Sequence, residues 1–409
     1  MEMFDTVALL LSLAAFFAFA NHHTLRLPTT LGVMAFALSF SLVVLAVGRL
    51  GGAPLGWMSW WHEVEFGPAL LEGMLGALLF AGALHVKLDD LFDQKWVVAL
   101  LATGGVLVST ISIGTLTWAG SGMLGFEIDF AHCLLFGALI SPTDPIAVLS
   151  VLKQVGVPRS LEMKIAGESL FNDGVGVVVF LVLLGIATGS GRADAASVGG
   201  LFLQEVVGGI VFGLGIGWIA YRMLRSMDDT KVELLVTLAV VTGGYALAGA
   251  LHISGPLAMV AAGLLLGNHG RRFGMSDTTR ENLDSFWELA DEVLNAVLFL
   301  MIGLEVLVLP WSTPRVFAGL LAIPLVLAVR FLAVGSLVSI LRRRRSFSPH
   351  VVKLLTWGGI RGGISVALAL SLPAGPERDV IVSATYVVVA FSILVQGLTI
   401  GPLTRRLYP

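Results

Sequence analysis

The sequence predicts an all-α polytopic membrane protein with about 13 transmembrane helices. Its 409 residues are 56% hydrophobic and only 13% charged, and the apolar residues fall in blocks of about twenty, the length that crosses a bilayer. The stretches 4–21, 28–48 and 199–221 are apolar around the whole helical circumference, whereas the helices of a soluble protein need a polar face. Lipid is therefore the expected solvent of most of the chain.

The basic residues orient the predicted spans. In chain order, the spans are 4–21, 28–48, 67–86, 96–118, 130–152, 160–187, 199–222, 231–250, 255–268, 286–308, 312–341, 351–372 and 379–403. Most of the Lys and Arg residues lie in the loops after odd-numbered spans or at the C-terminus, and only Arg49, Arg192, Arg315 and Arg378 lie on the other side. Since cytoplasmic loops are enriched in Lys and Arg, we expect an inner (plasma) membrane protein with its N-terminus outside and its C-terminus in the cytoplasm.

Composition excludes several classes of partner. A net charge of −3 indicates no nucleic-acid partner, and the arginine cluster at 342–345 lies between two spans, where it is typical of a topology anchor. The single cysteine, Cys133, excludes an intramolecular disulfide and a multi-cysteine metal site. We therefore expect no cofactor, and membrane lipid as the surrounding partner.

The fifth span contains a helix-breaking motif. In the run Leu-Ile-Ser-Pro-Thr-Asp-Pro-Ile-Ala-Val at 139–148, Pro142 and Pro145 each remove a backbone donor and oppose a continuous helix. Thr143 and Asp144 lie between the prolines. Unwound backbone at membrane depth persists only where it is buried in protein or faces water, and its free carbonyls are then potential ion ligands.

The sixth span carries two more acids, Glu168 and Asp173, and Asp173 falls close to its middle. A charge at the centre of a spanning helix costs about 2.5 to 3.5 kcal/mol, so each is a functional candidate. Glu168 and Asn172 share one helix face, while Asp173 is rotated from Asn172 by roughly 100°. Five other acids lie in the predicted spans, nearer their ends or in weaker contexts, and structural roles are expected for them: Glu72, Glu205, Asp291, Glu292 and Glu305.

The twelfth span has a matching irregularity, because four glycines surround Arg361 in the run Trp-Gly-Gly-Ile-Arg-Gly-Gly-Ile at 357–364. It lies seven spans after the fifth span. Because this offset is odd, the two broken helices run in opposite directions. Inverted repeats of spans 1–6 and 8–13 would produce this arrangement. Three buried acids against two buried arginines, Arg330 and Arg361, leave one acid without a counter-charge, and that acid must hold a proton or a cation such as sodium.

With these features, the chain resembles the NhaP-type sodium/proton exchangers of the monovalent cation/proton antiporter family, which includes the eukaryotic sodium/proton exchangers. The resemblance covers nearly the whole chain in span count and order. Its motifs are Ser-Pro-Thr-Asp-Pro-Ile-Ala-Val at 141–148, Gly-Glu-Ser-Leu-Phe-Asn-Asp-Gly at 167–174, Phe-Trp-Glu at 286–288 with Leu-Asn at 294–295 and Ile-Gly-Leu at 302–304, Arg330, and Gly-Gly-Ile-Arg-Gly at 358–362 with Gly363. Five motifs in the right order are a specific signal.

The resemblance implies a homodimer in which each chain has a dimerisation domain and a mobile core domain. It assigns residues 1–95 to dimerisation helices 1–3, and residues 199–308 to the linking helix 7 and dimerisation helices 8–10. The core domain comprises residues 96–190 and 312–409. The two broken helices are expected to cross within this core, near the ion site.

The resemblance also implies residue roles. In the family, the aspartate that matches Asp173 alternately carries the cation and the proton. The residues expected around it are Thr143, Asp144, Ser169 and Asn172. Of these, Thr143, Asp144 and Ser169 are also expected sodium ligands, together with Asp173. The glutamate that matches Glu168 forms a salt bridge with a core arginine, and both Arg361 and Arg330 are candidates.

The stoichiometry follows from two departures from electrogenic relatives. This chain has Asn172 before Asp173 where those relatives have two aspartates, and Arg330 where they tend to have a lysine. Because an arginine does not release its proton, only one carboxylate can turn over. We therefore expect electroneutral exchange of one sodium ion, with lithium as a second candidate, for one proton by alternating access. Potassium/proton exchange is the nearest alternative.

The sequence disfavours three other classes of protein. An ion channel would conduct without proton coupling and does not require paired broken helices. A sodium-coupled symporter would need a second cluster of intramembrane polar residues, and a sensor or scaffold would need a soluble output module. The sequence therefore favours a transporter, and no enzymatic activity is expected.

Overall fold

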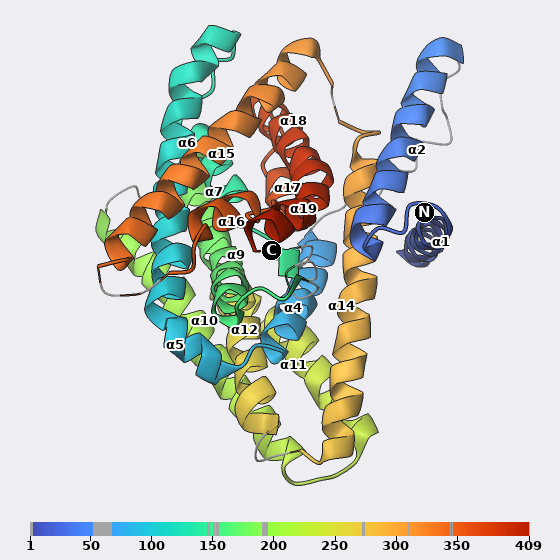
Figure 1. Ribbon diagram of the computed structural model, residues 1–409, viewed down its shortest axis with the longest axis vertical. Coiled ribbons are helices and arrows are strands. Elements are labelled where there is room, and N and C mark those ends of the chain that lie inside the picture. Colours follow the sequence, from blue (N-terminus) through green and yellow to red (C-terminus); the bar gives the residue numbers. More distant parts are fainter. Residues whose placement is uncertain are drawn as a thin grey trace.

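The computed structural model describes residues 3–51, 68–144, 148–149, 152, 155–189, 195–271, 275–309, 311–343, 345 and 347–408. Within these ranges every regular element is helical (Figure 1). Eight helical segments of the described chain are long and apolar enough to cross a membrane. Each of the thirteen predicted spans coincides with helical residues, which confirms the all-helical membrane fold, while the number of crossings stays a prediction.

The helices follow the predicted order. The α-helices are α1 (Met3–His23), α2 (Thr29–Gly51), α4 (Pro68–Leu84), α5 (Leu88–Ala99), α6 (Gly105–Ser121), α7 (Phe130–Ile140), α9 (Arg159–Ala187), α10 (Ala195–Leu224), α11 (Thr230–Ala250), α12 (Gly255–Leu265), α14 (Asp277–Glu305), α15 (Thr313–Leu341), α16 (Val351–Trp357), α17 (Gly363–Leu370), α18 (Pro376–Phe391) and α19 (Gly397–Leu407). The π-helical turns η2 (Leu100–Gly104), η4 (Leu266–Gly270) and η5 (Ser392–Gln396) continue α5, α12 and α18, and the 3₁₀ turn η3 (Gly122–Leu124) follows α6.

The fifth predicted span is interrupted at Pro142. Helix α7 begins at its cap Asp129, whose Oδ1 accepts a hydrogen bond from His132 N at 2.7 Å. It ends after 11 residues, about half the length that crosses a bilayer. Residues 141–144 are not helical, and helical residues reappear at 148 and 149; Pro145 lies outside the described residues.

The twelfth predicted span is interrupted at its glycines. The chain leaves the helix between α16 and α17, over residues 358–362. The two interruptions touch, because Asp144 N donates a hydrogen bond to Ile360 O at 2.7 Å, as in an antiparallel β-bridge. This bond pairs one backbone group from each break, in keeping with the need for internal hydrogen bonds at membrane depth.

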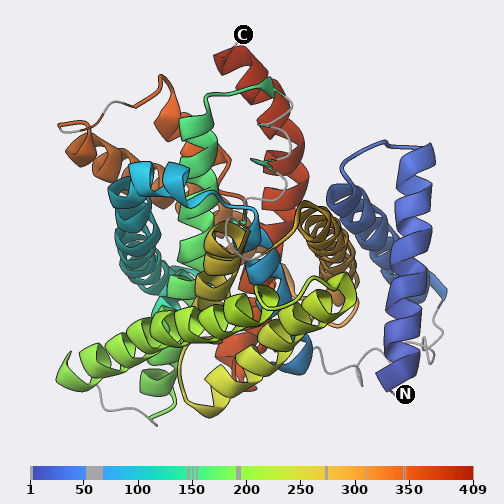
Figure 2. The ribbon, with the colours of Figure 1, turned by 90° about the horizontal axis from the view of Figure 1, so that it is seen from below.

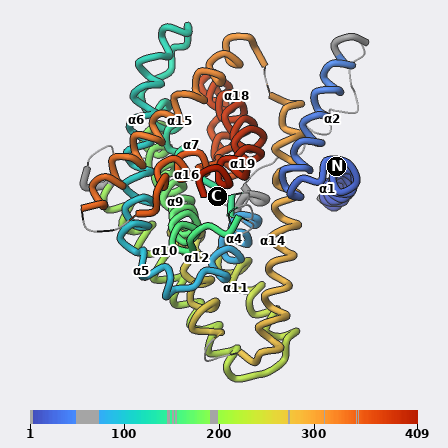
Figure 3. Tube along the Cα trace, viewed as in Figure 1, coloured from blue at the N-terminus to red at the C-terminus, as the bar shows by residue number. Residues whose placement is uncertain are grey.

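The buried apolar residues form two large clusters. One unites α6, α7, α9 and α15 to α19 with parts of α2 and of the second half of α14, and the other unites α4, α10, α11, α12 and the first half of α14. Helix α9 contributes to both. Helices α1 and α2 pack to one side, against the second half of α14 (Figure 2), and α14 runs along most of the long axis of the molecule (Figure 3).

Candidate functional site

Side chains of α9 hold the unwound segment after α7. Asn172 Nδ2 donates a hydrogen bond to Thr143 Oγ1 at 2.8 Å, and Asn172 Oδ1 accepts one from Thr143 N at 3.3 Å. Ser169 Oγ donates to the carbonyl oxygen of Thr143. All three residues are buried. The structure therefore brings together three of the predicted site residues in one hydrogen-bonded unit between the two predicted spans.

Asp173 lies beside this unit, and no other described residue binds its side chain. The residue is 7% exposed, yet within the described part of the chain its carboxylate makes no hydrogen bond and no ion pair. Asp144 is close enough for the two carboxylates to repel each other. A buried charge without compensation is strongly disfavoured, so this carboxylate requires a proton or a cation.

Asp144 is fixed by the second interruption. Its backbone N–H is bound to Ile360 O, and its side chain packs against the backbone of Gly362. A Cβ atom at residue 362 would lie 2.4 Å from Asp144 Oδ2, so only glycine permits this approach. The glycines of the twelfth span therefore both interrupt the helix and make room for the carboxylate.

Glu168 faces away from Asp173 and is neutralised. Arg330 Nη1 of α15 lies 2.6 Å from Glu168 Oε1, and the two side chains are 5% and 2% exposed. Arg330 Nη2 also donates to Leu355 O at 3.2 Å, at the end of α16. Of the two arginines that were candidates for Glu168, Arg330 is the one in contact.

Arg361 binds backbone carbonyls at the end of α7. Its Nη1 donates to the carbonyl oxygens of Ser141 at 2.5 Å and Pro142 at 2.8 Å. These carbonyls follow the C-terminal end of α7, where the helix dipole places partial negative charge. Arg361 is 2% exposed and forms no ion pair with a described carboxylate. Its guanidinium is therefore hydrogen-bonded to unwound backbone, and not to any of the three acids.

The structure adds residues that sequence reasoning missed. Ser392 Oγ accepts from Arg361 N at 2.9 Å and donates to Gln396 Oε1 at 2.5 Å, while Gln396 Nε2 donates to Trp357 O at 2.9 Å. The signal was a polar pair four residues apart in the second half of the thirteenth span, which is mostly apolar. Asp291 of α14, expected to be structural only, lies near enough to Asp144 to interact electrostatically.

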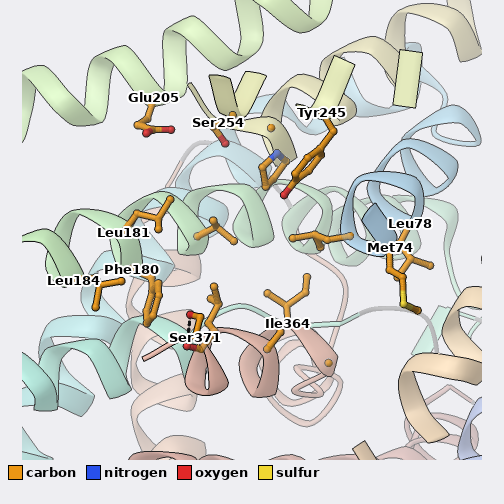
Figure 4. Close-up of a pocket in the computed structure, with 18 of the residues that line it drawn as sticks. Met74, Leu78, Phe180, Leu181, Leu184, Glu205, Tyr245, Ser254, Ile364 and Ser371 are labelled. Atoms are coloured by element: carbon orange, nitrogen blue, oxygen red, sulfur yellow. Dashed lines mark hydrogen bonds between the residues drawn. The ribbon is translucent and has the colours of Figure 1, made fainter. Parts of the chain in front are cut away.

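A cavity of about 450 Å³ lies next to the site, among α4, α9 to α12, α14 and α17. Its walls are mostly apolar, with Glu205, Tyr245, His252, Ser254 and Ser371 as polar exceptions (Figure 4). It reaches Val177, one helical turn beyond Asp173 in α9. The cavity thus ends close to the Asp173 carboxylate.

A polytopic helical fold in which two interrupted helices meet beside buried acids and arginines is the architecture of a secondary transporter. The chain belongs to the sodium/hydrogen exchanger family, since the family model described as "Sodium/hydrogen exchanger, transmembrane" matches residues 10–406. This confirms the resemblance that the motifs indicated. The family is one of transporters and not of enzymes.

The individual relatives of the chain are also named as sodium/proton antiporters. The chain is 51% identical to the Na(+)/H(+) antiporter NhaP of Pseudomonas aeruginosa, over 99% of this chain and 97% of that protein. It is 37% identical to the Na(+)/H(+) antiporter NhaH of Halobacillus dabanensis, over 84% of each. The structure of the sodium proton antiporter MjNhaP1 from Methanocaldococcus jannaschii at pH 8 shares the fold, with a TM-score of 0.75 at 20% identity over 100% of this chain and 99% of that one.

Proposed function

We propose that this protein exchanges sodium, or lithium, for a proton across the cell inner membrane, with one cation per proton. The observation that carries the proposal is the buried Asp173 carboxylate without a hydrogen bond or ion pair among the described residues. The names of the relatives, all sodium/proton antiporters, support the same ions. The N-terminus lies outside and the C-terminus in the cytoplasm in this proposal, as the distribution of basic residues predicts.

Sodium is the cargo, and oxygen atoms are its ligands. The ion binds to the carboxylates of Asp173 and Asp144 and to the hydroxyl oxygens of Thr143 and Ser169, because an alkali ion that has shed water needs hard oxygen donors. Asn172 holds Thr143 in position, since the nitrogen and the oxygen of its amide are both hydrogen-bonded to Thr143. A proton on Asp173 removes its negative charge, so proton and sodium exclude each other.

Exchange requires that the ion site opens to each side of the membrane in turn. The helices around the first apolar cluster, at 96–190 and 312–409, form a mobile core domain in which the interrupted helices cross, and the helices at 1–95 and 199–308 form the dimerisation domain. Most residues of the first apolar cluster belong to 96–190 and 312–409, and most residues of the second belong to the other ranges, which supports this division. If the core moves only when Asp173 is neutral, each passage carries either sodium or a proton.

Electroneutrality yields a direct prediction. In proteoliposomes containing a pH-sensitive dye, sodium should dissipate a proton gradient at a rate and to an end point that an imposed membrane potential does not change. The reason is that one positive charge moves each way, because Arg330, held by Glu168 at 2.6 Å, keeps its own proton.

Adding sodium, lithium and potassium in turn to the same vesicles tests the ion preference. A response to sodium and lithium supports the proposal, whereas a response to potassium alone contradicts it. An end point that shifts with voltage at fixed ion gradients would exclude one-for-one exchange.

A further inference from the structure

Three exposed arginines follow the end of α15. Helix α15 ends at Leu341, and the next residues include Arg342, Arg343 and Arg345, whose side chains are exposed. None of the three forms an ion pair with any carboxylate of the described chain, whereas the exposed Arg159 is paired with Asp90. Such a group of cations directly outside a spanning helix attracts anionic lipid headgroups.

A second segment completes this surface. Arg345 Nη1 donates a hydrogen bond to Asp93 O of α5 at 3.3 Å. Leu337, one turn before the end of α15, lies 3.9 Å from the positions where Gly104 and Gly105 would carry a Cβ atom. Figures 1 and 2 both show the end of α15 beside α5 and the start of α6. Helix α5 thereby brings a further cation to the same end of the molecule, the exposed Lys95, which forms no ion pair within the described chain.

The same elements carry apolar side chains suited to a membrane interface. Phe92 and Trp96, one turn apart on α5, are 58% and 66% exposed, and Lys95 Nζ lies 5.8 Å from the Phe92 ring centroid. Aromatic rings of this kind sit at the level of the lipid headgroups. Towards the membrane interior, Ile111 of α6 and Leu332 of α15, nine residues before the end of that helix, are 59% and 67% exposed. Cations at headgroup level thus lie above apolar surface at acyl-chain level.

We propose that Arg342, Arg343 and Arg345, with Lys95, bind the phosphate of an anionic phospholipid of the cytoplasmic leaflet, whose acyl chains lie along α6 and α15. Guanidinium groups bind phosphate oxygens through paired hydrogen bonds. The acyl chains add apolar contacts that a free phosphate ion cannot make. This site is distinct from the ion site, and it goes beyond the topology-anchoring role that basic loops share.

Native mass spectrometry of the purified full-length protein, titrated with phosphatidylglycerol or phosphatidylcholine, tests the proposal. The triple variant Arg342→Gln/Arg343→Gln/Arg345→Gln should bind phosphatidylglycerol roughly a hundredfold more weakly, because each basic residue near an anionic surface contributes about fivefold. The single variant Arg343→Gln, whose side chain makes no described hydrogen bond or ion pair, should show about a fivefold loss and keeps the test valid if the triple variant does not fold.

The matched control is Arg405→Gln/Arg406→Gln, which removes two exposed cations from the last turn of α19. It should bind phosphatidylglycerol like the unmodified protein, and the triple Arg→Lys variant should keep most of the affinity. Three results would overturn the proposal: unchanged phosphatidylglycerol binding in the Gln variants, an equal loss in the α19 control, or equal binding of phosphatidylcholine. Displacement of the lipid by millimolar inorganic phosphate would also overturn it, since it would identify a free anion as the ligand.

Discussion

Asp173→Asn should abolish sodium/proton exchange and leave a folded protein. The amide cannot take up or release a proton, and it offers a bound cation no negative charge. Because it is nearly isosteric with the carboxylate, and because Asp173 has no described hydrogen bond or ion pair to lose, the fold should tolerate it. Sodium-driven proton movement in proteoliposomes should fall to the rate of protein-free vesicles.

The control for this variant is Asp89→Asn, the same change at an exposed acid of α5, which should transport normally. Size-exclusion elution of both variants should match that of the unmodified protein. Transport at the unmodified rate by Asp173→Asn would eliminate the proposed mechanism. A variant that aggregates would be replaced by Asp173→Ser, for which the same loss is expected.

Arg330→Leu should cause the largest loss of stability in the site. It leaves the Glu168 carboxylate buried without its partner, and breaking a buried pair in this way costs about 3–5 kcal/mol. The free energy of unfolding can be measured by SDS titration in mixed micelles. The double variant Glu168→Gln/Arg330→Leu should recover part of the loss, because no isolated charge remains.

Arg159→Leu is the matched control for Arg330→Leu. Its partner Asp90 lies at 2.5 Å, a contact as short as that of Arg330 with Glu168, but the side chains of Arg159 and Asp90 are 61% and 28% exposed. An exposed pair of this kind contributes about 1 kcal/mol or less. If Arg330→Leu costs no more than this control, the Glu168–Arg330 pair is not a structural anchor of the core.

The breaks in the helices were predictable from sequence because their causes are local. Pro142 cannot donate a backbone hydrogen bond, and the glycines around Arg361 loosen a helix wherever they occur. The candidate acids were predictable because a charge in an apolar span is conspicuous. That Asp144 N would pair with Ile360 O was not predictable, since residues more than 200 positions apart meet only through the tertiary fold.

The partners of the charges were not predictable for the same reason. Arg330 and Arg361 are both buried cations in apolar spans, and helical periodicity does not show which one reaches Glu168. The structure resolves this through distance: one guanidinium lies at the carboxylate, and the other lies at the carbonyls of Ser141 and Pro142. The π-helical turn at Ser392–Gln396, which orients two polar side chains beside Arg361, has no recognised sequence pattern.

Calorimetric titration of the purified protein with sodium, repeated in buffers of different ionisation enthalpy, tests the competition for Asp173 most directly. We expect each bound sodium ion to release about one proton at a pH where the site is protonated, and Asp173→Asn to show neither sodium binding nor proton release. Sodium binding without proton release, or with full affinity in Asp173→Asn, would place the cation elsewhere and contradict the account.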